Sequence, residues 1–151
     1  MQPVSPQNID KHPQIIDKFK FYYSDLKKTN IVTLNDLYED HIRFVDPVHE
    51  INGLDCLICY FDNMVKNTTE CRFEFLDQCI AADKAYFKWK MYYAHPKISS
   101  ARQCLKGATH IEFNKKISFH EDIYDLGAMV YEHLPVIGKV TKVVKSRLSQ
   151  Y

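Results

Sequence analysis

Apolar residues near the start of the chain recur at the three- and four-residue spacing of an amphipathic helix. This spacing predicts helices over residues 15–26, 33–38 and 54–65. Between the second and third helices, residues 41–46 alternate in the manner of a strand, which Pro47 ends because proline has no N–H to donate to a sheet. In the first helix the apolar positions are Ile15, Ile16, Phe19, Tyr22, Tyr23 and Leu26.

The second half of the chain alternates with the two-residue period of extended strands. Short polar connections separate the alternating segments, so we expect an antiparallel meander. The four predicted strands cover residues 71–82, 85–96, 101–113 and 117–124.

The second of these strands carries an aromatic face and a mixed face. We expect the aromatic face to point inward, since half-buried strands alternate between core and solvent. The inward set is Phe87, Trp89, Met91 and Tyr93. The outward set is Tyr86, Lys88, Lys90 and Tyr92, joined by His110 from the next strand. This outer face has more aromatic character than a solvated surface needs, and we therefore expect a homodimer through it.

The two ends of the chain have distinct patterns. Residues 1–12 are rich in proline and predict an extended lead-in, followed by one domain over 13–151. A last amphipathic helix is expected over 136–148, with a solvated basic face made by Lys139, Lys142, Lys145 and Arg147. Without an apolar stretch of membrane-spanning or signal-peptide type, we expect no membrane association and a cytoplasmic location.

The net charge and the absence of known sequence motifs argue against several classes of function. Twenty basic and nineteen acidic residues give a net charge of +1, so nucleic acid is not an expected partner. The four glycines form no phosphate-binding loop, and no zinc motif occurs, so we expect no cofactor and no metal. The five cysteines are expected to stay reduced, and Cys56 and Cys59 are expected to be buried, unpaired and without a redox role.

The last predicted strand has a row of polar residues along one of its faces. Alternation places His120, Asp122 and Tyr124 on one face, where a core would be apolar. A histidine beside a carboxylate in a partly dry cavity is suited to general acid–base chemistry. The alternatives are a buried hydrogen-bonded network that only fixes the fold, or a stripe that faces water.

A resemblance to a known superfamily appears in the segment Tyr38-Glu39-Asp40-His41 through Phe44-Val45-Asp46-Pro47-Val48, with Gly53 before a helix. Together with the order of elements over residues 15–125, it resembles the nuclear transport factor 2-like superfamily, which includes SnoaL-like polyketide cyclases and ketosteroid isomerases. The resemblance implies an α+β, cone-shaped (cystatin-like) fold, in which a curved antiparallel sheet packs with N-terminal helices. The C-terminal helix is an addition to it.

The same resemblance implies roles for individual residues. Asp46 takes the position of the isomerase aspartate that shuttles a proton, and Tyr22 that of the tyrosine that holds the enolate. Thr109 falls where the isomerases carry a neutral acid, which argues against true ketosteroid isomerase activity because a hydroxyl is a weaker donor. Asp46 has a structural alternative as a turn cap, and Tyr22 as a core aromatic.

These observations predict an enclosed pocket for a small hydrophobic molecule. As an enzyme, the chain would be an isomerase, cyclase or dehydratase acting on a carbonyl substrate. The competing class is a non-catalytic ligand-binding or dimerisation module, since one fold hosts both. The expected acid–base groups are Asp46, His120, Asp122 and Tyr22. The expected ligand-binding set is Phe87, Trp89, Met91, Tyr93, Thr109 and Tyr124.

Overall fold

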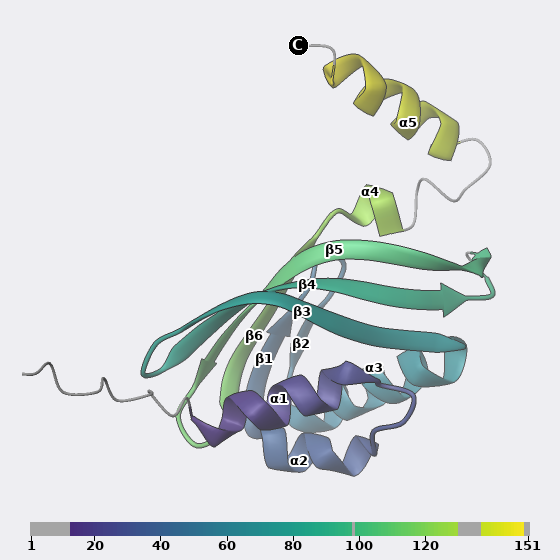
Figure 1. The fold of residues 1–151 in the computed structure, drawn as a ribbon. Coiled ribbons are helices and arrows are strands. Elements are labelled where there is room, and N and C mark those ends of the chain that lie inside the picture. Colours follow the sequence, from purple (N-terminus) through teal and green to yellow (C-terminus); the bar gives the residue numbers. More distant parts are fainter. Residues whose placement is uncertain (1–12, 98, 130–136, 150–151) are drawn as a thin grey trace, which may run out of the picture.

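A curved six-stranded sheet with three helices across one face organises the chain (Figure 1). It is described from a computed structural model for residues 13–97, 99–129 and 137–149. The helical elements are α1 (Gln14–Ser24), η1 (Ile31–Thr33), α2 (Leu34–Leu37), α3 (Leu54–Asn67), α4 (Leu126–Met129) and α5 (Ile137–Leu148). The strands are β1 (Tyr38–Val45), β2 (Glu50–Asn52), β3 (Glu70–Ile80), β4 (Lys84–His95), β5 (Ser99–Phe113) and β6 (Ile117–Tyr124).

The sheet has the order β2-β1-β6-β5-β4-β3. Strands β3 to β6 form the expected antiparallel meander, but β1 pairs with β6 in parallel, so the sheet is mixed. Irregularities in the pairing occur between Phe75 and Asp77 and between Glu112 and Phe113. Such bulges bend a strand and increase its twist, which fits the curvature visible in Figure 1.

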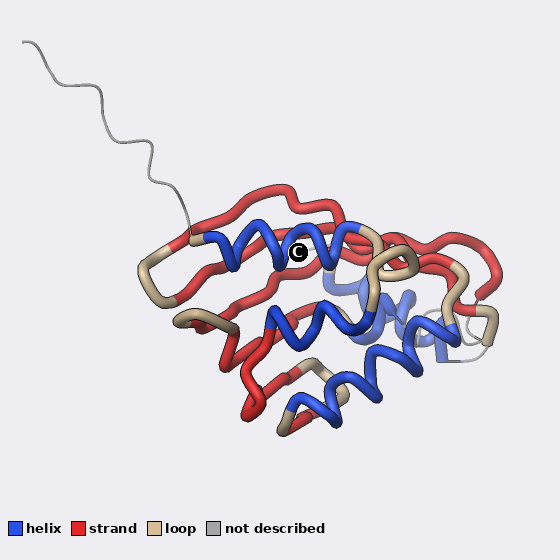
Figure 2. Tube along the Cα trace, turned by 90° about the horizontal axis from the view of Figure 1, so that it is seen from below, coloured by secondary structure: helices blue, strands red, loops and turns tan. Residues whose placement is uncertain are grey.

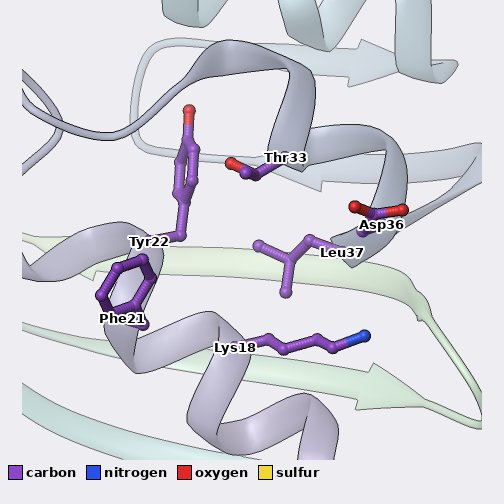
Figure 3. Close-up of a pocket in the computed structure, with 6 residues that line it drawn as sticks. All are labelled: Lys18, Phe21, Tyr22, Thr33, Asp36 and Leu37. Atoms are coloured by element: carbon purple, nitrogen blue, oxygen red, sulfur yellow. The ribbon is translucent and has the colours of Figure 1, made fainter.

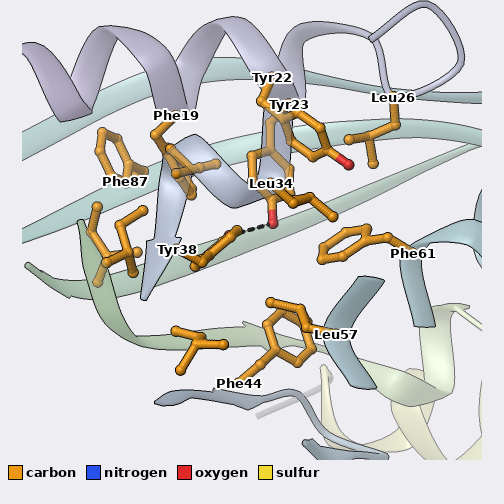
Figure 4. Packing of buried hydrophobic residues seen from close by; sticks show 14 of the residues in the cluster. Phe19, Tyr22, Tyr23, Leu26, Leu34, Tyr38, Phe44, Leu57, Phe61 and Phe87 are labelled. Atoms are coloured by element: carbon orange, nitrogen blue, oxygen red, sulfur yellow. Dashed lines mark hydrogen bonds between the residues drawn. The ribbon is translucent and has the colours of Figure 1, made fainter. Parts of the chain in front are cut away.

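Helices α1, α2 and α3 lie across the concave face of the sheet (Figure 2). The core fills the space between these helices and the sheet. The expected inward face of β4 is confirmed, since its four members are exposed by no more than 7%. All six apolar positions predicted for the first helix are also buried. Figure 4 shows how Phe19 and Tyr23 of α1 meet Tyr38 of β1 in this core.

Two local features differ from the sequence expectations. Tyr38 begins β1 instead of ending the second helix, and β2 forms an additional edge strand. Gly53 opens α3 at a φ of 93°, a conformation that favours glycine over residues with a side chain.

The C-terminal helix is confirmed over Ile137–Leu148, and its basic residues are exposed. Its valines 140, 143 and 144 are also at least half exposed, so α5 does not bury its apolar side against the sheet, from which it extends away in Figure 1. The extended lead-in over 1–12 lies outside the described residues. No helix in the described part of the chain is long and apolar enough to cross a membrane.

Candidate functional site

A central pocket lies between the concave sheet face and the helices. Its volume is about 40 Å³, roughly the space of two or three water molecules. This is far below the roughly 300–1,000 Å³ of most small-molecule sites. Its walls come from α1, β1, α3, β3, β4, β6 and α4, through Tyr23, Leu26, Phe44, Asp46, Tyr60, Phe61, Met64, Phe73, Trp89, Met91, Asp122, Tyr124 and Met129.

Asp122 is held in this wall by two hydrogen-bond donors that do not themselves line the pocket. Thr109, directly opposite it on β5, donates its hydroxyl to Asp122 Oδ1 at 2.5 Å. His120 Nε2 contacts the same oxygen at 2.9 Å. The other oxygen, Oδ2, makes no hydrogen bond to any described residue and is not fully buried, so it is the oxygen available to a molecule in the pocket.

These contacts belong to a longer chain of hydrogen bonds. The direction of donation along it follows from the Trp89 indole, which stands at one end. The Trp89 indole can only donate, so Thr109 accepts from it at 2.8 Å and must direct its own proton to Asp122. In the neutral tautomer that donates from Nε2 to the Asp122 carboxylate, His120 Nδ1 accepts the hydrogen bond of the Tyr38 hydroxyl at 2.7 Å.

The Tyr38 hydroxyl in turn lies 2.8 Å from that of Tyr23, and Tyr23 also lines the pocket. Burial is the main cause that raises the pKa of both phenols well above the ordinary value, so both remain neutral donors. The network therefore fixes the imidazole tautomer and orients Asp122 without introducing a further charge.

His120 itself is completely buried and does not touch the pocket. Aromatic rings surround its imidazole, with Phe44 nearest at 4.8 Å between ring centroids and Phe19 at 5.6 Å. This position excludes direct contact with a ligand. His120 acts on the site through Asp122.

Asp46, at the end of β1, is a second carboxylate in the pocket wall. Its Oδ1 accepts hydrogen bonds from the backbone N–H groups of Val48 and His49, both at 2.7 Å, and thus caps the turn. Its Oδ2 accepts the Tyr60 hydroxyl at 3.0 Å, and the His49 ring lies 3.1 Å from each oxygen. The turn-cap alternative is therefore realised, and Asp46 keeps less free acceptor capacity than Asp122.

Two phenols lie near both carboxylates. Burial is the largest cause that raises the pKa of Tyr60 and Tyr124, and the charges of Asp46 and Asp122 contribute to both shifts. Tyr124 lines the pocket next to Asp122 on β6, and its hydroxyl makes no hydrogen bond to a described residue. It is therefore a neutral donor that a ligand oxygen can use.

The expected site residues separate into three groups. Five of them line the central pocket: Asp46, Trp89, Met91, Asp122 and Tyr124. His120 and Thr109 lie outside the pocket wall and are hydrogen-bonded to Asp122. Phe87, Tyr93 and Tyr22 are buried but lie outside the pocket wall.

Tyr93 and Tyr22 have other neighbours. The Tyr93 hydroxyl donates to the Met129 carbonyl at 2.9 Å and so ties α4 to the sheet beside the pocket. Tyr22 borders a separate apolar hollow of about 210 Å³ between α1 and α2, with Lys18 and Asp36 at its edge (Figure 3). That hollow is larger than the central pocket but contains none of the carboxylate network.

Sequence reasoning missed several contributors to the site. Tyr23 was expected only as a core position, and Tyr60 lies beside the apolar stripe of α3 without belonging to it. Tyr38 reaches His120 across 82 positions of sequence through the pairing of β1 with β6. The signal available for these residues was their residue type, since a buried tyrosine needs a partner for its hydroxyl.

The expectation that Cys56 and Cys59 are buried was wrong. Cys56 and Cys59 are exposed because they lie on the side of α3 that faces away from the core, whereas Leu57 and Phe61 are buried. Cys71 is the buried thiol, and burial is the main cause that raises its pKa to about 12. In the described part of the chain, no three ligating side chains come together in a way that suits a metal ion.

Comparisons with solved structures support the fold. The chain is similar to a hypothetical protein with a ketosteroid isomerase-like fold from Catenulispora acidiphila, solved in complex with trimethylamine, at a TM-score of 0.68 and 14% identity over 78% of this chain and 90% of that chain. It is also similar to a candidate SnoaL-like polyketide cyclase from Shewanella putrefaciens, at a TM-score of 0.67 and 15% identity over 79% of this chain and 95% of that chain.

A protein of unknown function from Burkholderia pseudomallei, with a nuclear transport factor 2-like fold, gives a TM-score of 0.68 and 13% identity over 77% of this chain and 92% of that chain. At such identities the likeness establishes the fold alone. No curated protein sequence matches the chain. The SnoaL-like domain model matches residues 20–120, most of the sequence, and the chain therefore belongs to the SnoaL-like domain family.

Proposed function

We propose that this chain binds a small organic molecule in its central pocket and catalyses cofactor-free proton transfer on it, with Asp122 as the general base. The observation that carries the proposal is the placement of Asp122. One carboxylate oxygen is held by Thr109 and His120, and the other remains available at the pocket. A base whose geometry is fixed in advance is what general base catalysis requires.

The reaction class follows from the groups around Asp122. The free oxygen would take a proton from carbon next to a carbonyl, and the electron pair of that C–H bond would move towards the carbonyl oxygen. Tyr124 would donate a hydrogen bond to the developing enolate, because its raised pKa keeps the phenol protonated. Return of the proton to another carbon would complete an isomerisation. In a cyclisation the enolate carbon would instead bond to a second carbonyl carbon of the substrate, whose oxygen would take the proton. In a dehydration the enolate would expel a β-hydroxyl group, which would leave as water with that proton.

The volume of the pocket favours a compact ligand. At about 40 Å³ the space does not hold a fused-ring substrate unless side chains such as Met64 and Met129 move. The trimethylamine complex of the Catenulispora relative supports the idea that this fold takes very small organic molecules. We therefore favour a substrate of few heavy atoms over a polyketide.

The alternative is a ligand-binding module without catalysis. It is favoured by Asp46, whose acceptor capacity is occupied by its own turn and by Tyr60. The two functions share the pocket and differ only in whether Asp122 removes a proton.

The experiment is hydrogen–deuterium exchange at carbon, followed by NMR in D₂O for a panel of small ketones and aldehydes. This assay detects removal of a proton next to a carbonyl, whatever product the reaction goes on to form. We expect the protein to accelerate exchange for at least one compact member of the panel. Binding of panel members without any acceleration would favour the non-catalytic module instead.

We also propose that two copies pair through the outer face of the sheet. Tyr86 stacks on His110 with 4.4 Å between ring centroids, His110 contacts Phe119, and Ile123 is 55% exposed. Burial of this apolar surface would favour a homodimer.

Sedimentation at micromolar concentration tests the pairing. We expect a dimer for the wild type and a shift towards monomer for the Tyr86→Ser/Ile123→Ser protein, since polar replacements reduce the apolar area. Phe21→Ser is the matched control, because Phe21 is 72% exposed on α1, away from this face. A wild-type protein that sediments only as a monomer would contradict the proposal.

A further inference from the structure

The wall of the central pocket carries an unbalanced charge. Its thirteen side chains include two carboxylates, Asp46 and Asp122, but no lysine, arginine or histidine. Both carboxylates are removed from bulk water, with side chains exposed by 2% and 12%. Burying anions in this way is unfavourable unless hydrogen bonds or positive charges compensate them.

The compensation that the protein supplies comes mainly from neutral dipoles. Asp122 accepts hydrogen bonds from Thr109 and His120. Asp46 accepts hydrogen bonds from two backbone N–H groups and from the Tyr60 hydroxyl. His49, which is 46% exposed, approaches Asp46 from the solvent side of the turn. No described lysine or arginine forms an ion pair with either carboxylate.

Most of the remaining wall is aromatic, and Leu26 and three methionines complete it. Phe73 meets Trp89 at 4.9 Å between centroids, and Trp89 meets Tyr124 at 6.5 Å. On the other side, Phe44 meets Tyr60 at 5.5 Å. Ring faces attract cations through their quadrupole, most strongly in desolvated sites, and groups of such rings are the usual receptors for methylated ammonium groups.

The two carboxylates also act on one shared region. Burial is the largest cause that raises the pKa of Tyr60 on α3 and of Tyr124 on β6, and the charges of both carboxylates raise it further. A positive charge placed among these groups would interact favourably with both anions at once, in surroundings where water screens little.

We propose that the central pocket selects a small organic cation, an amine in its ammonium form or a quaternary ammonium, over a neutral molecule of the same shape. The inference rests on the proposed function in taking this pocket as the ligand site. It adds the charge and the size of the ligand. A substrate of this class carries its ammonium group between the carboxylates and the rings, with the carbon that loses a proton near Asp122 Oδ2.

The test compares two probes of nearly equal shape on the full chain, tetramethylammonium chloride and tert-butanol, at matched ionic strength. Trp89 is the single tryptophan and lines the pocket, so its fluorescence reports occupancy directly. We expect tetramethylammonium to bind about tenfold more tightly than tert-butanol. The Asp122→Asn protein, which removes charge but keeps shape, should lose most of this preference.

The matched control is Asp83→Asn, which removes the same charge from the β3–β4 turn, away from the pocket. It should leave the preference unchanged. Equal loss in both variants would mean that only the net charge of the protein matters, and would overturn the inference.

The outcomes separate this inference from the proposed catalysis. Equal binding of both probes, or binding of tert-butanol alone, overturns cation selection and leaves the exchange assay unaffected. A cation preference that depends on Asp122, found in a protein without exchange activity, supports the cation site while catalysis fails. A fluorescence change of the same size with sodium chloride in place of tetramethylammonium chloride also overturns the inference.

Discussion

An Asp122→Asn protein is expected to fold normally and to lose about 10²- to 10⁴-fold of the rate of carbon-bound proton exchange. The amide oxygen keeps the position of Oδ1, so it still accepts from Thr109 and His120. What disappears is the basic oxygen at the pocket. The measurement is the exchange rate by NMR, together with the urea midpoint of unfolding to establish that the fold is retained.

Two further variants make this result specific. Asp83→Asn should leave the rate unchanged, because that carboxylate lies in the β3–β4 turn. Asp46→Asn should reduce the rate less than Asp122→Asn, because the Asp46 carboxylate is already hydrogen-bonded to the backbone of its own turn and to the Tyr60 hydroxyl. A full rate in Asp122→Asn with a large loss in Asp46→Asn would transfer the role of base to Asp46.

Part of this site could be predicted from the sequence because strand alternation is a local property. The two-residue period of residues 117–124 places His120, Asp122 and Tyr124 on one face, and the structure has them on the inner side of the sheet. The inward face of β4 followed from the same period. Such inferences need only the geometry of one strand.

The hydrogen-bond network could not be predicted in the same way. It depends on the register of β1 against β6, in which Phe44 lies opposite His120, and this pairing joins distant segments in parallel. The sequence pattern also assigned Tyr38 to a helix, whereas tertiary pairing makes it the first residue of β1. Without that pairing, nothing indicates that Tyr38 supports His120.

Pocket size was also beyond sequence reasoning. Alternation identified an aromatic lining, but the free volume of about 40 Å³ depends on how the side chains from seven elements fill the space. Phe87 and Tyr93 share the inward face with Trp89 and Met91, yet pack outside the pocket wall. A face of a strand is therefore not equivalent to a binding surface.

Gly107 is the position where a single methyl group is expected to disturb both the fold and the pocket. It lies on β5 directly opposite Trp89, whose indole passes over it to reach Thr109. A Cβ atom here would come within 2.3 Å of the Trp89 ring and 2.8 Å of the Ile123 carbonyl oxygen. The ring is 1% exposed and the carbonyl belongs to β6, so neither has room to move.

Gly107→Ala is therefore expected to lower the free energy of unfolding by about 3 kcal/mol, the upper end for overpacking a core. Displacement of Trp89 would also break its hydrogen bond to Thr109 and loosen the support of Asp122. Urea denaturation measures the first effect, and a red shift of the single tryptophan's emission measures the second. Lys106→Ala, at the exposed neighbouring position, is the control and should change neither quantity. A Gly107→Ala protein with wild-type stability and emission would show that the indole does not pack against β5 in this way.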